Sequence, residues 1–232
     1  MINIFKIKSQ LPVTDYAPSW NISIGNTVWQ DADKIDSIKN WLLANEDMIK
    51  EKYPVSTIGG DTGLGADSIS SRIGMYNLFD FTEELPELKD LLKFLQTSYI
   101  NFVKTEYASV YDLVLVSWVN ILRSGENIRE HVHSASNISY LSANLHLDNY
   151  STQTIYKSPY ERFNDFAFDN VKGGLTIFPS YVPHTTSEYT NLDVPRVSIA
   201  FDLRLPYTVP QDQPNHNFMS REIFEQLSLG NN

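Results

Sequence analysis

The first half of the chain carries two long helical patterns of apolar positions, and the second half carries short strand patterns. In residues 34–50 the apolar side chains recur every three to four positions, and residues 85–106 repeat this spacing with Pro86 near the start. Such spacing puts apolar side chains on one helical face, and proline suits a first turn because its missing N–H would have no partner there. We therefore expect two amphipathic helices in this half.

From residue 111 onward the pattern changes to that of β-strands. The run DLVLVSWVNIL is long and apolar, and SYLSANLHLDN alternates polar with apolar residues. GGLTIFPS and RVSIAFDLRL are further strand candidates, with TQTIYK and DFAF as shorter ones. Successive short strands without helices between them favour an antiparallel jelly roll or barrel. The fold class is therefore mainly β with α, and we expect the helices to pack on the outer face.

The change of pattern divides the chain into three regions. Residues 1–110 form a mixed helix and strand region that supports the barrel, and residues 111–206 form the β core. Residues 207–232 form a tail in which an irregular polar stretch, PYTVPQDQPNHN from Pro206, precedes a short helix in REIFEQLSL. A chain of 232 residues can still make one compact domain, and we expect one.

Four glycines between the two predicted helices mark a loop, in STIGGDTGLGADSISSR (residues 56–72). A plain surface loop is the first interpretation, and a lid over an active site is the alternative. No Gly-Lys-Ser/Thr follows, which argues against a phosphate-binding loop.

Composition narrows the classes of partner. The net charge is −10, so nothing draws the protein as a whole to nucleic-acid phosphates or anionic lipids. There is no cysteine, which excludes disulfides and thiolate metal sites. We see no signal peptide and no apolar run long enough for a bilayer. We expect a soluble cytoplasmic protein without nucleic-acid or membrane partners.

Three histidines are the main candidates for chemistry. His131 and His133 stand one residue apart in REHVHSAS, so on a strand their side chains would point the same way. His184 follows in IFPSYVPHTT, and Gly125 and Gly173 ahead of the two motifs suit tight turns between strands. Three imidazoles on one face of a transition metal leave the other face open for substrate and O2, as in non-haem iron oxygenases.

Arg196 follows on the next predicted strand, and Ser198 shares its face. A guanidinium gives a carboxylate two parallel hydrogen bonds, and a hydroxyl alongside adds another. The pair therefore suits an acidic co-substrate. Taken alone, Arg196 would be interpreted as a surface residue of an edge strand.

The second half of the chain resembles the iron- and 2-oxoglutarate-dependent oxygenases, in particular a bacterial and phage group of them. The resemblance covers roughly residues 111–205 and rests on four motifs: SWVNIL before His-x-His, YLSANLHL after it, the segment G-G-L-x-I-F-P-S-x-x-x-H, and an R-x-S strand. It implies a double-stranded β-helix, Fe(II) and 2-oxoglutarate. It further implies a dioxygenase that hydroxylates its substrate.

The resemblance also implies roles for individual residues. His131, His133 and His184 would hold iron, and Arg196 with Ser198 would anchor the far carboxylate of 2-oxoglutarate. His146 lies where relatives often carry a tyrosine that contacts this carboxylate. Weaker candidates for co-substrate contacts are Asn120 and Asn144, and for these and His146 a polar row on a half-buried strand is the alternative.

One position departs from the superfamily pattern. The second ligand there is usually Asp or Glu, whereas this chain has His133. Either His133 is a ligand, which we favour, or it lies behind the ligands and water completes the site. The nearby carboxylates are Glu130, Asp148 and Asp202, and Glu130 has the wrong strand parity to replace it.

Two other classes of protein remain open. A metal cupin would use the same histidines without 2-oxoglutarate, as an isomerase or a ring-cleaving dioxygenase. A jelly roll that only binds or supports a partner would use none of them for catalysis. The substrate is not encoded in any motif, so a small metabolite, a free amino acid and a peptidyl residue are all candidates, and a homodimer is compatible with the sequence.

Overall fold

A computed structural model describes residues 2–56, 62–158, 165–191 and 193–229. Two of the four glycines in the predicted loop, Gly59 and Gly60, lie outside the described residues. Among the helices that are described, none is long and apolar enough to cross a membrane.

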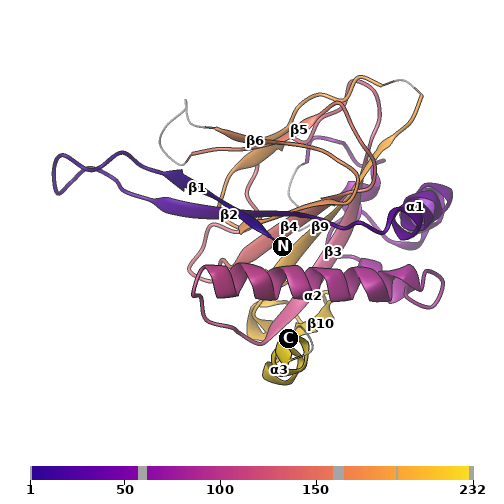
Figure 1. Ribbon diagram of the computed structural model, residues 1–232. Coiled ribbons are helices and arrows are strands. Elements are labelled where there is room, and N and C mark those ends of the chain that lie inside the picture. Colours follow the sequence, from indigo (N-terminus) through magenta and orange to yellow (C-terminus); the bar gives the residue numbers. More distant parts are fainter. Residues whose placement is uncertain (1, 57–61, 159–164, 192, 230–232) are drawn as a thin grey trace.

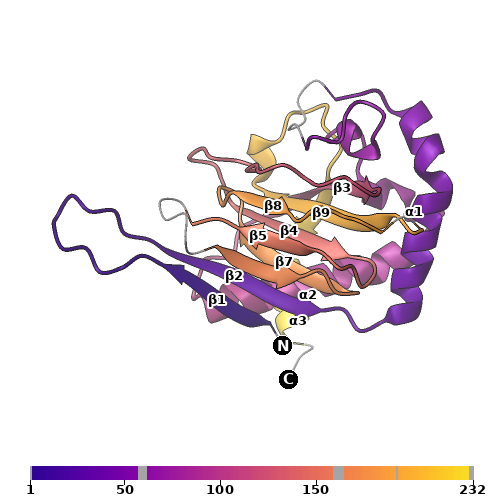
Figure 2. The same cartoon turned by 90° about the horizontal axis from the view of Figure 1, so that it is seen from above.

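Two antiparallel sheets lie face to face, a larger one of seven strands and a smaller one of three (Figures 1 and 2). The larger sheet has the order β1-β2-β7-β4-β9-β3-β10, and the smaller has the order β6-β5-β8. The predicted jelly roll is therefore confirmed. The strands are β1 (Asn3–Lys8), β2 (Asn21–Val28), β3 (Leu113–Leu122), β4 (Leu141–His146), β5 (Gln153–Tyr156), β6 (Phe166–Asp169), β7 (Gly174–Pro179), β8 (His184–Thr186), β9 (Arg196–Arg204) and β10 (His216–Met219).

Helices cover the outer face and one end of the larger sheet. α2 (Glu87–Thr105) runs across the face turned away from the smaller sheet, and α1 (Ala32–Lys52) closes one end (Figure 1). Both helices confirm the sequence prediction to within two residues at each end, and α3 (Arg221–Leu229) confirms the short helix of the tail. Short 3-10 turns complete the helical elements: η1 (Ile69–Arg72), η2 (Leu78–Phe81) and η3 (Pro206–Thr208).

The main core lies between α2 and the larger sheet. The face of α2 that carries Leu88, Leu95 and Phe102 packs against apolar side chains of the sheet such as Ile177 and Phe201. This burial follows from period-two strands, in which alternate residues face the helix. The opposite face of the same strands is therefore left for the space between the sheets.

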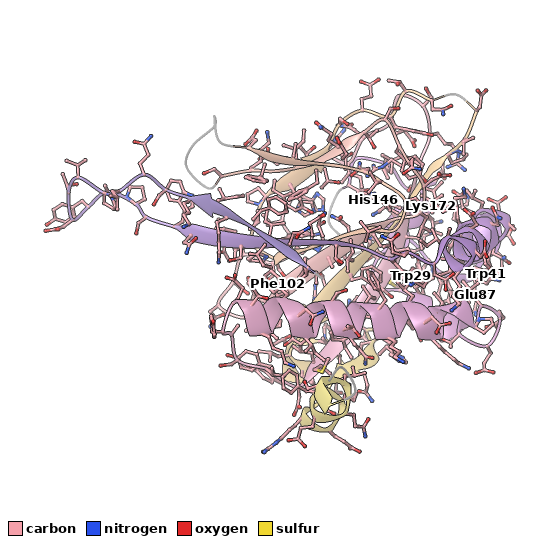
Figure 3. The ribbon with its side chains drawn as sticks, viewed as in Figure 1. Trp29, Trp41, Glu87, Phe102, His146 and Lys172 are labelled. Atoms are coloured by element: carbon pink, nitrogen blue, oxygen red, sulfur yellow. The ribbon has the colours of Figure 1, made fainter. Side chains whose placement is uncertain are left out.

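Polar contacts hold α1 to its neighbours. The Ser37 hydroxyl donates to Glu87 of α2 at 2.7 Å, and the Lys172 ammonium contacts Asp36 at 2.7 Å. Glu87 and Lys172 both lie beside α1 (Figure 3). These contacts fix the helix against α2 and against the turn that precedes β7.

The prediction for the tail was wrong in one part. The end of the stretch predicted as irregular forms β10, which pairs antiparallel with β3 through His216 and Leu115. The edge of β3 offers unpaired backbone groups, and a short polar segment can satisfy them without an apolar pattern of its own. In addition, β1 and β2 extend the other edge of this sheet. The division into three regions stays a prediction.

A stability prediction follows from two glycines with left-handed backbones. At Gly125 (φ +87°) a Cβ would enter open space, whereas at Gly173 (φ +73°) it would lie 2.1 Å from the Trp29 carbonyl oxygen. Gly125→Ala should lower the free energy of unfolding by about 1–2 kcal/mol through backbone strain. Gly173→Ala should cost about 1–3 kcal/mol more through overpacking.

The measurement is chemical denaturation of both variants beside the parent protein. Gly125→Ala is the control for backbone strain, since both positions share the left-handed conformation. Equal losses of stability would show that the contact with Trp29 is relieved at no cost.

Candidate metal centre

The backbone around His131 is held against β8. His131 and His184 each donate their N–H to the other's carbonyl oxygen at 3.0 Å. On either side, Tyr189 N–H donates to Glu126 O at 2.9 Å and His133 N–H donates to Ser180 O at 2.9 Å. Residues 126–133 thus run antiparallel beside residues 180–189 and continue the smaller sheet.

The prediction that His131 and His133 lie on a regular strand was wrong. His131 makes an isolated bridge with His184, and residues 132 and 133 belong to no strand. The chain turns here because the N–H groups of His133 and Ser134 both donate to the Ser180 carbonyl oxygen. The two rings nevertheless face the same way, with centroids 5.2 Å apart and planes 19° apart.

The three histidine side chains converge. One ring nitrogen from each of His131, His133 and His184 lies within 4.8 Å of the others. The ring centroid of His184 lies 4.4 Å from that of His131 and 5.0 Å from that of His133. This spacing suits a single ion bound by all three, since a bond from zinc to a histidine nitrogen, for example, measures about 2.0–2.1 Å.

The second nitrogen of each ring has an oxygen partner. The Nδ1 atom of His131 lies 2.8 Å from the Arg129 carbonyl oxygen, and that of His184 lies 3.1 Å from the Val182 carbonyl oxygen. The Nδ1 atom of His133 lies 2.5 Å from Asp202 Oδ1. A carbonyl or carboxylate oxygen only accepts, so each Nδ1 carries the proton and each Nε2 presents its lone pair.

The environment favours the neutral form of His131 and His184. Burial, together with the neighbouring His133, lowers the pKa of His131 to about 4. Burial and the neighbouring histidines hold the pKa of His184 well below its ordinary value. A metal ion needs the neutral ring, so these shifts suit a ligand set.

Aromatic side chains surround the rings. Trp118 of β3 lies 5.3 Å from the ring of His133, and Phe178 of β7 lies 4.7 Å from that of His184, between ring centroids. These contacts restrict the orientation of both imidazoles.

A cavity of about 270 Å³ opens between the sheets at this cluster. All predicted site residues line it, namely His131, His133, His184, Arg196, Ser198, His146, Asn120 and Asn144. The structure thus brings together every one of these residues, while their individual roles stay predictions.

Arg196 is the most unusual of these residues. Its side chain is buried, with the residue only 1% exposed, and its Nε and Nη1 atoms have no hydrogen-bond partner among the described residues. Burial lowers the pKa of its guanidinium to about 10, so the group stays charged at neutral pH. A buried charge without a partner is strongly unfavourable. The position therefore suits an anion bound in the cavity.

Polar side chains form a row beside Arg196 on the inner face of the larger sheet. Ser198 of β9 is directly opposite Asn120 of β3 on one side and His146 of β4 on the other. His146 reaches between the sheets toward Thr154 of β5, and its Nδ1 atom has no partner among the described residues (Figure 3). Ser198 and His146 thus offer polar atoms close to the guanidinium.

The two asparagines, Asn120 and Asn144, are less available to bind a ligand in the cavity. Asn120 Oδ1 accepts a hydrogen bond from Ser70 Oγ at 2.7 Å. Asn144 donates to the Tyr156 hydroxyl at 3.2 Å and accepts from Thr176 at 2.7 Å. The amide of Asn144 is therefore engaged at both ends within the protein.

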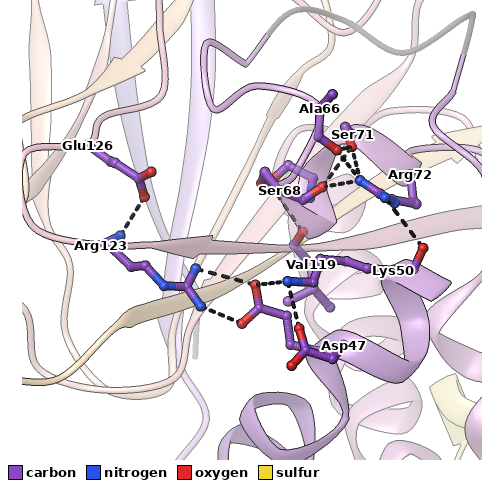
Figure 4. A network of polar contacts seen from close by, with 11 residues as sticks. Asp47, Lys50, Ala66, Ser68, Ser71, Arg72, Val119, Arg123 and Glu126 are labelled. Atoms are coloured by element: carbon purple, nitrogen blue, oxygen red, sulfur yellow. Dashed lines mark hydrogen bonds and ion pairs between the residues drawn. The ribbon is translucent and has the colours of Figure 1, made fainter.

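Residues of the glycine-rich stretch and just after it form one wall of the cavity. Thr62, Ile73 and Met75 line it. Arg72 holds this wall by donating to the carbonyl oxygens of Ala66, Ser68 and, in α1, Lys50 (Figure 4). The wall is thus fastened to the C-terminal end of α1.

Sequence reasoning named Asp202 only as a nearby carboxylate and did not predict its contact with His133. Asp202 lines the cavity from β9 and contacts His133, whereas Glu130 is exposed and Asp148 pairs with Lys39. Asp202 shares strand parity with Arg196 and Ser198, and this signal could have found it. Burial by itself would raise the pKa of Asp202, but the hydrogen bonds from His133 and Ser142 and the charge of Arg204 hold it below its ordinary value.

The comparisons with known proteins agree with this geometry. Residues 116–202 match the sequence model of a family described as "Putative 2OG-Fe(II) oxygenase". No curated protein matches the chain.

Two solved structures share the fold. A prolyl-4-hydroxylase from Pseudomonas putida is 12% identical, with a TM-score of 0.51, and the match covers 78% of this chain and 92% of the other. The non-haem, alpha-ketoglutarate-dependent epimerase SnoN of nogalamycin biosynthesis is 11% identical, with a TM-score of 0.51, over 85% and 93% of the two chains. At this identity the likeness shows the fold alone.

Residues 116–202 are thus similar in sequence to the 2OG-Fe(II) oxygenases, and the chain shares the fold of solved members, as the resemblance predicts. The double-stranded β-helix is likewise confirmed. The family implies Fe(II) and 2-oxoglutarate as cofactor and co-substrate. The donor set fits both, since three imidazole nitrogens converge and a buried guanidinium lacks a partner in the same cavity, among the residues that the structure describes.

The geometry predicts that metal binding depends on the histidine cluster. His131→Ala and His184→Ala should each lose most of the bound Fe(II) while the protein stays folded, because each removes one of three nitrogen ligands. His216→Ala is the control, since His216 lies outside the cavity and stacks on Phe79 of η2. Metal content by mass spectrometry under anaerobic conditions measures this. Full occupancy in both cluster variants would contradict the site.

Proposed function

We propose that the protein is a 2-oxoglutarate-dependent Fe(II) dioxygenase that hydroxylates a small-molecule or peptidyl substrate. One observation carries the proposal. A cluster of three imidazoles with their Nε2 atoms free and a buried guanidinium without a partner among the described residues lie in one cavity. The family match favours this function over a metal cupin, which has no use for the guanidinium.

When bound, ferrous iron with 2-oxoglutarate supplies O2 activation. The overall reaction would put one oxygen atom of O2 into succinate, with loss of CO2 from 2-oxoglutarate, and the other into a C–H bond of the substrate. The two electrons from the decarboxylation and the two from the C–H bond together reduce O2. The protein contributes binding, orientation and the exclusion of water.

The histidines would hold the metal from one side. The Nε2 atoms of His131, His133 and His184 are the proposed ligands, and their fixed Nδ1 partners leave the rings little freedom. A ligand set on one face leaves other positions for co-substrate and O2. The reorganisation on metal binding is therefore small.

Arg196 would anchor 2-oxoglutarate by its far carboxylate. A guanidinium can give the two parallel hydrogen bonds that a carboxylate accepts, and the Nε and Nη1 atoms of Arg196 have no partner among the described residues. Ser198 and His146 stand beside it and add donors. Asn120 is a further candidate, whereas the engaged amide of Asn144 suits a role in holding the inner face together.

The substrate would enter past the wall that contains Ile73 and Met75. This part of the cavity also carries Gln213 and Arg204. It combines apolar surface with a few polar groups, as small-molecule and peptide sites do. The fold also occurs in a prolyl-4-hydroxylase and in an epimerase, so hydroxylation needs its own test.

The proposed role of Arg196 predicts that replacing it weakens co-substrate binding specifically. Arg196→Ala should raise the dissociation constant for 2-oxoglutarate at least about tenfold, since a hydrogen bond to a charged group contributes about 1.5–3 kcal/mol. Arg196→Lys should recover only part of the affinity, because an ammonium lacks the planar fork. Fe(II) affinity without co-substrate should stay nearly constant.

The assay is an anaerobic titration of the iron protein with 2-oxoglutarate, followed by its metal-to-ligand charge-transfer band. Arg221→Ala in α3 is the control, since the Arg221 side chain is exposed and far from the cavity lining. An iron-loaded parent protein without this band and without affinity for 2-oxoglutarate would overturn the proposal in favour of a cupin.

Product analysis distinguishes hydroxylation from other outcomes. With ¹⁸O2 and a screen of free amino acids, peptides and small metabolites, the true substrate should raise succinate release. Its product should gain one labelled oxygen atom. Raised succinate release with a product of unchanged mass would contradict hydroxylation and point to an epimerisation.

A further inference from the structure

Asp202 is the one carboxylate among the described residues that line the cavity, and both of its oxygens are occupied. It lies on β9 and is only 4% exposed. Its Oδ1 atom lies 2.5 Å from His133 Nδ1 and accepts from Ser142 Oγ at 2.7 Å. Its Oδ2 atom accepts from the Arg204 guanidinium at 2.9 Å. The carboxylate is thus held in one orientation.

The partner of His133 differs from those of the other two histidines. His131 and His184 donate their Nδ1–H to main-chain carbonyl oxygens, which are neutral. Of the three, His133 alone donates to a charged group. A carboxylate behind a ligating imidazole fixes its tautomer and makes the ring a stronger donor to metal.

The different partner of His133 changes the charge around the metal position. Three neutral imidazoles leave the two positive charges of Fe(II) uncompensated by the ligands themselves. Asp202 places a negative charge one ring away from the metal position, in a buried setting where charges are weakly screened. Arg204 neutralises it only in part, since its own side chain is 30% exposed to solvent.

We infer that Asp202 is a positioning residue that acts through His133: it orients the imidazole and supplies the negative charge that the three-histidine ligand set lacks. The inference rests on the proposed metal centre. Asp202 itself is no ligand, because its Oδ1 already serves His133 and Ser142 while its Oδ2 serves Arg204. It is also absent from the group of described side chains whose atoms converge.

The first test is metal binding by Asp202→Asn, with Co(II) as an air-stable probe and Fe(II) under anaerobic conditions. Asparagine keeps the shape but removes the charge, and its NH2 group can donate to Nδ1 and favour the wrong tautomer. The dissociation constants should rise about 10- to 100-fold. The Fe(III)/Fe(II) midpoint potential should also rise, because a buried negative charge stabilises the ferric form more.

Glu130→Gln is the matched control. Glu130 also lies close to the histidines in sequence, but it is exposed. Its loss should leave metal affinity and potential unchanged. Thermal unfolding of Asp202→Asn checks that the protein is folded. A folded Asp202→Asn protein with parental affinity and potential would overturn the inference.

The second test removes the imidazole through which Asp202 is inferred to act. His133→Asp should still bind metal, because a carboxylate then provides both ligand and charge. In that background Asp202 has no ring to orient and repels the new carboxylate. Asp202→Asn should therefore leave metal affinity unchanged or improve it. A loss as large as in the parent protein would overturn the inference, since Asp202 would then act independently of His133.

The proposed function and the role of Asp202 would be refuted by different results. A parent protein that binds neither Co(II) nor Fe(II) would refute the proposed function itself. A parent protein that binds metal and 2-oxoglutarate, with an Asp202→Asn variant that matches it, would refute only the role of Asp202.

Discussion

The site depends on the reciprocal hydrogen bonds between the main chains of His131 and His184. This one pair joins residues 126–133 to β8 and brings two of the three imidazoles to a centroid separation of 4.4 Å. Residues that exchange both hydrogen bonds in an antiparallel pair have Cα atoms about 5.5 Å apart, so their side chains must be neighbours. The third imidazole, His133, follows from the turn that Ser180 imposes two residues later. The geometry of the three imidazoles is thus a property of the backbone.

The larger sheet connects the apolar core with the cavity, because each of its central strands contributes side chains to both. On β9, Val197 and Phe201 pack toward α2, while Arg196, Ser198 and Asp202 face the cavity. A shift of register by one residue would exchange the two sets. The apolar core on one face therefore holds the polar row on the other in place. Buried charges such as Arg196 and Asp202 reduce stability by themselves, and the core compensates for them.

The sequence predicted the helices and strands that follow a repeating pattern of apolar positions. It missed the features that depend on a single contact. Period-two and period-3.6 patterns predicted the central strands and both long helices, and strand parity placed Arg196 and Ser198 on one face. β10 could not be predicted, because its pairing is set by the free edge of β3 and not by its own pattern. Asp202 was considered only as a substitute ligand, since nothing local shows that a residue 69 positions from His133 lies beside it.

The burial of Arg196 also has a consequence for handling the protein. A guanidinium that cannot release its proton near neutral pH, and that lacks an acceptor among the described residues, attracts whatever anion fits the cavity. If 2-oxoglutarate binds there as proposed, acetate, citrate and sulfate in a purification buffer would compete with it for the same hydrogen bonds. An apparent affinity measured in such buffers describes an exchange of anions. Measurements in buffers whose anions are too large for a cavity of about 270 Å³ will give the intrinsic affinity.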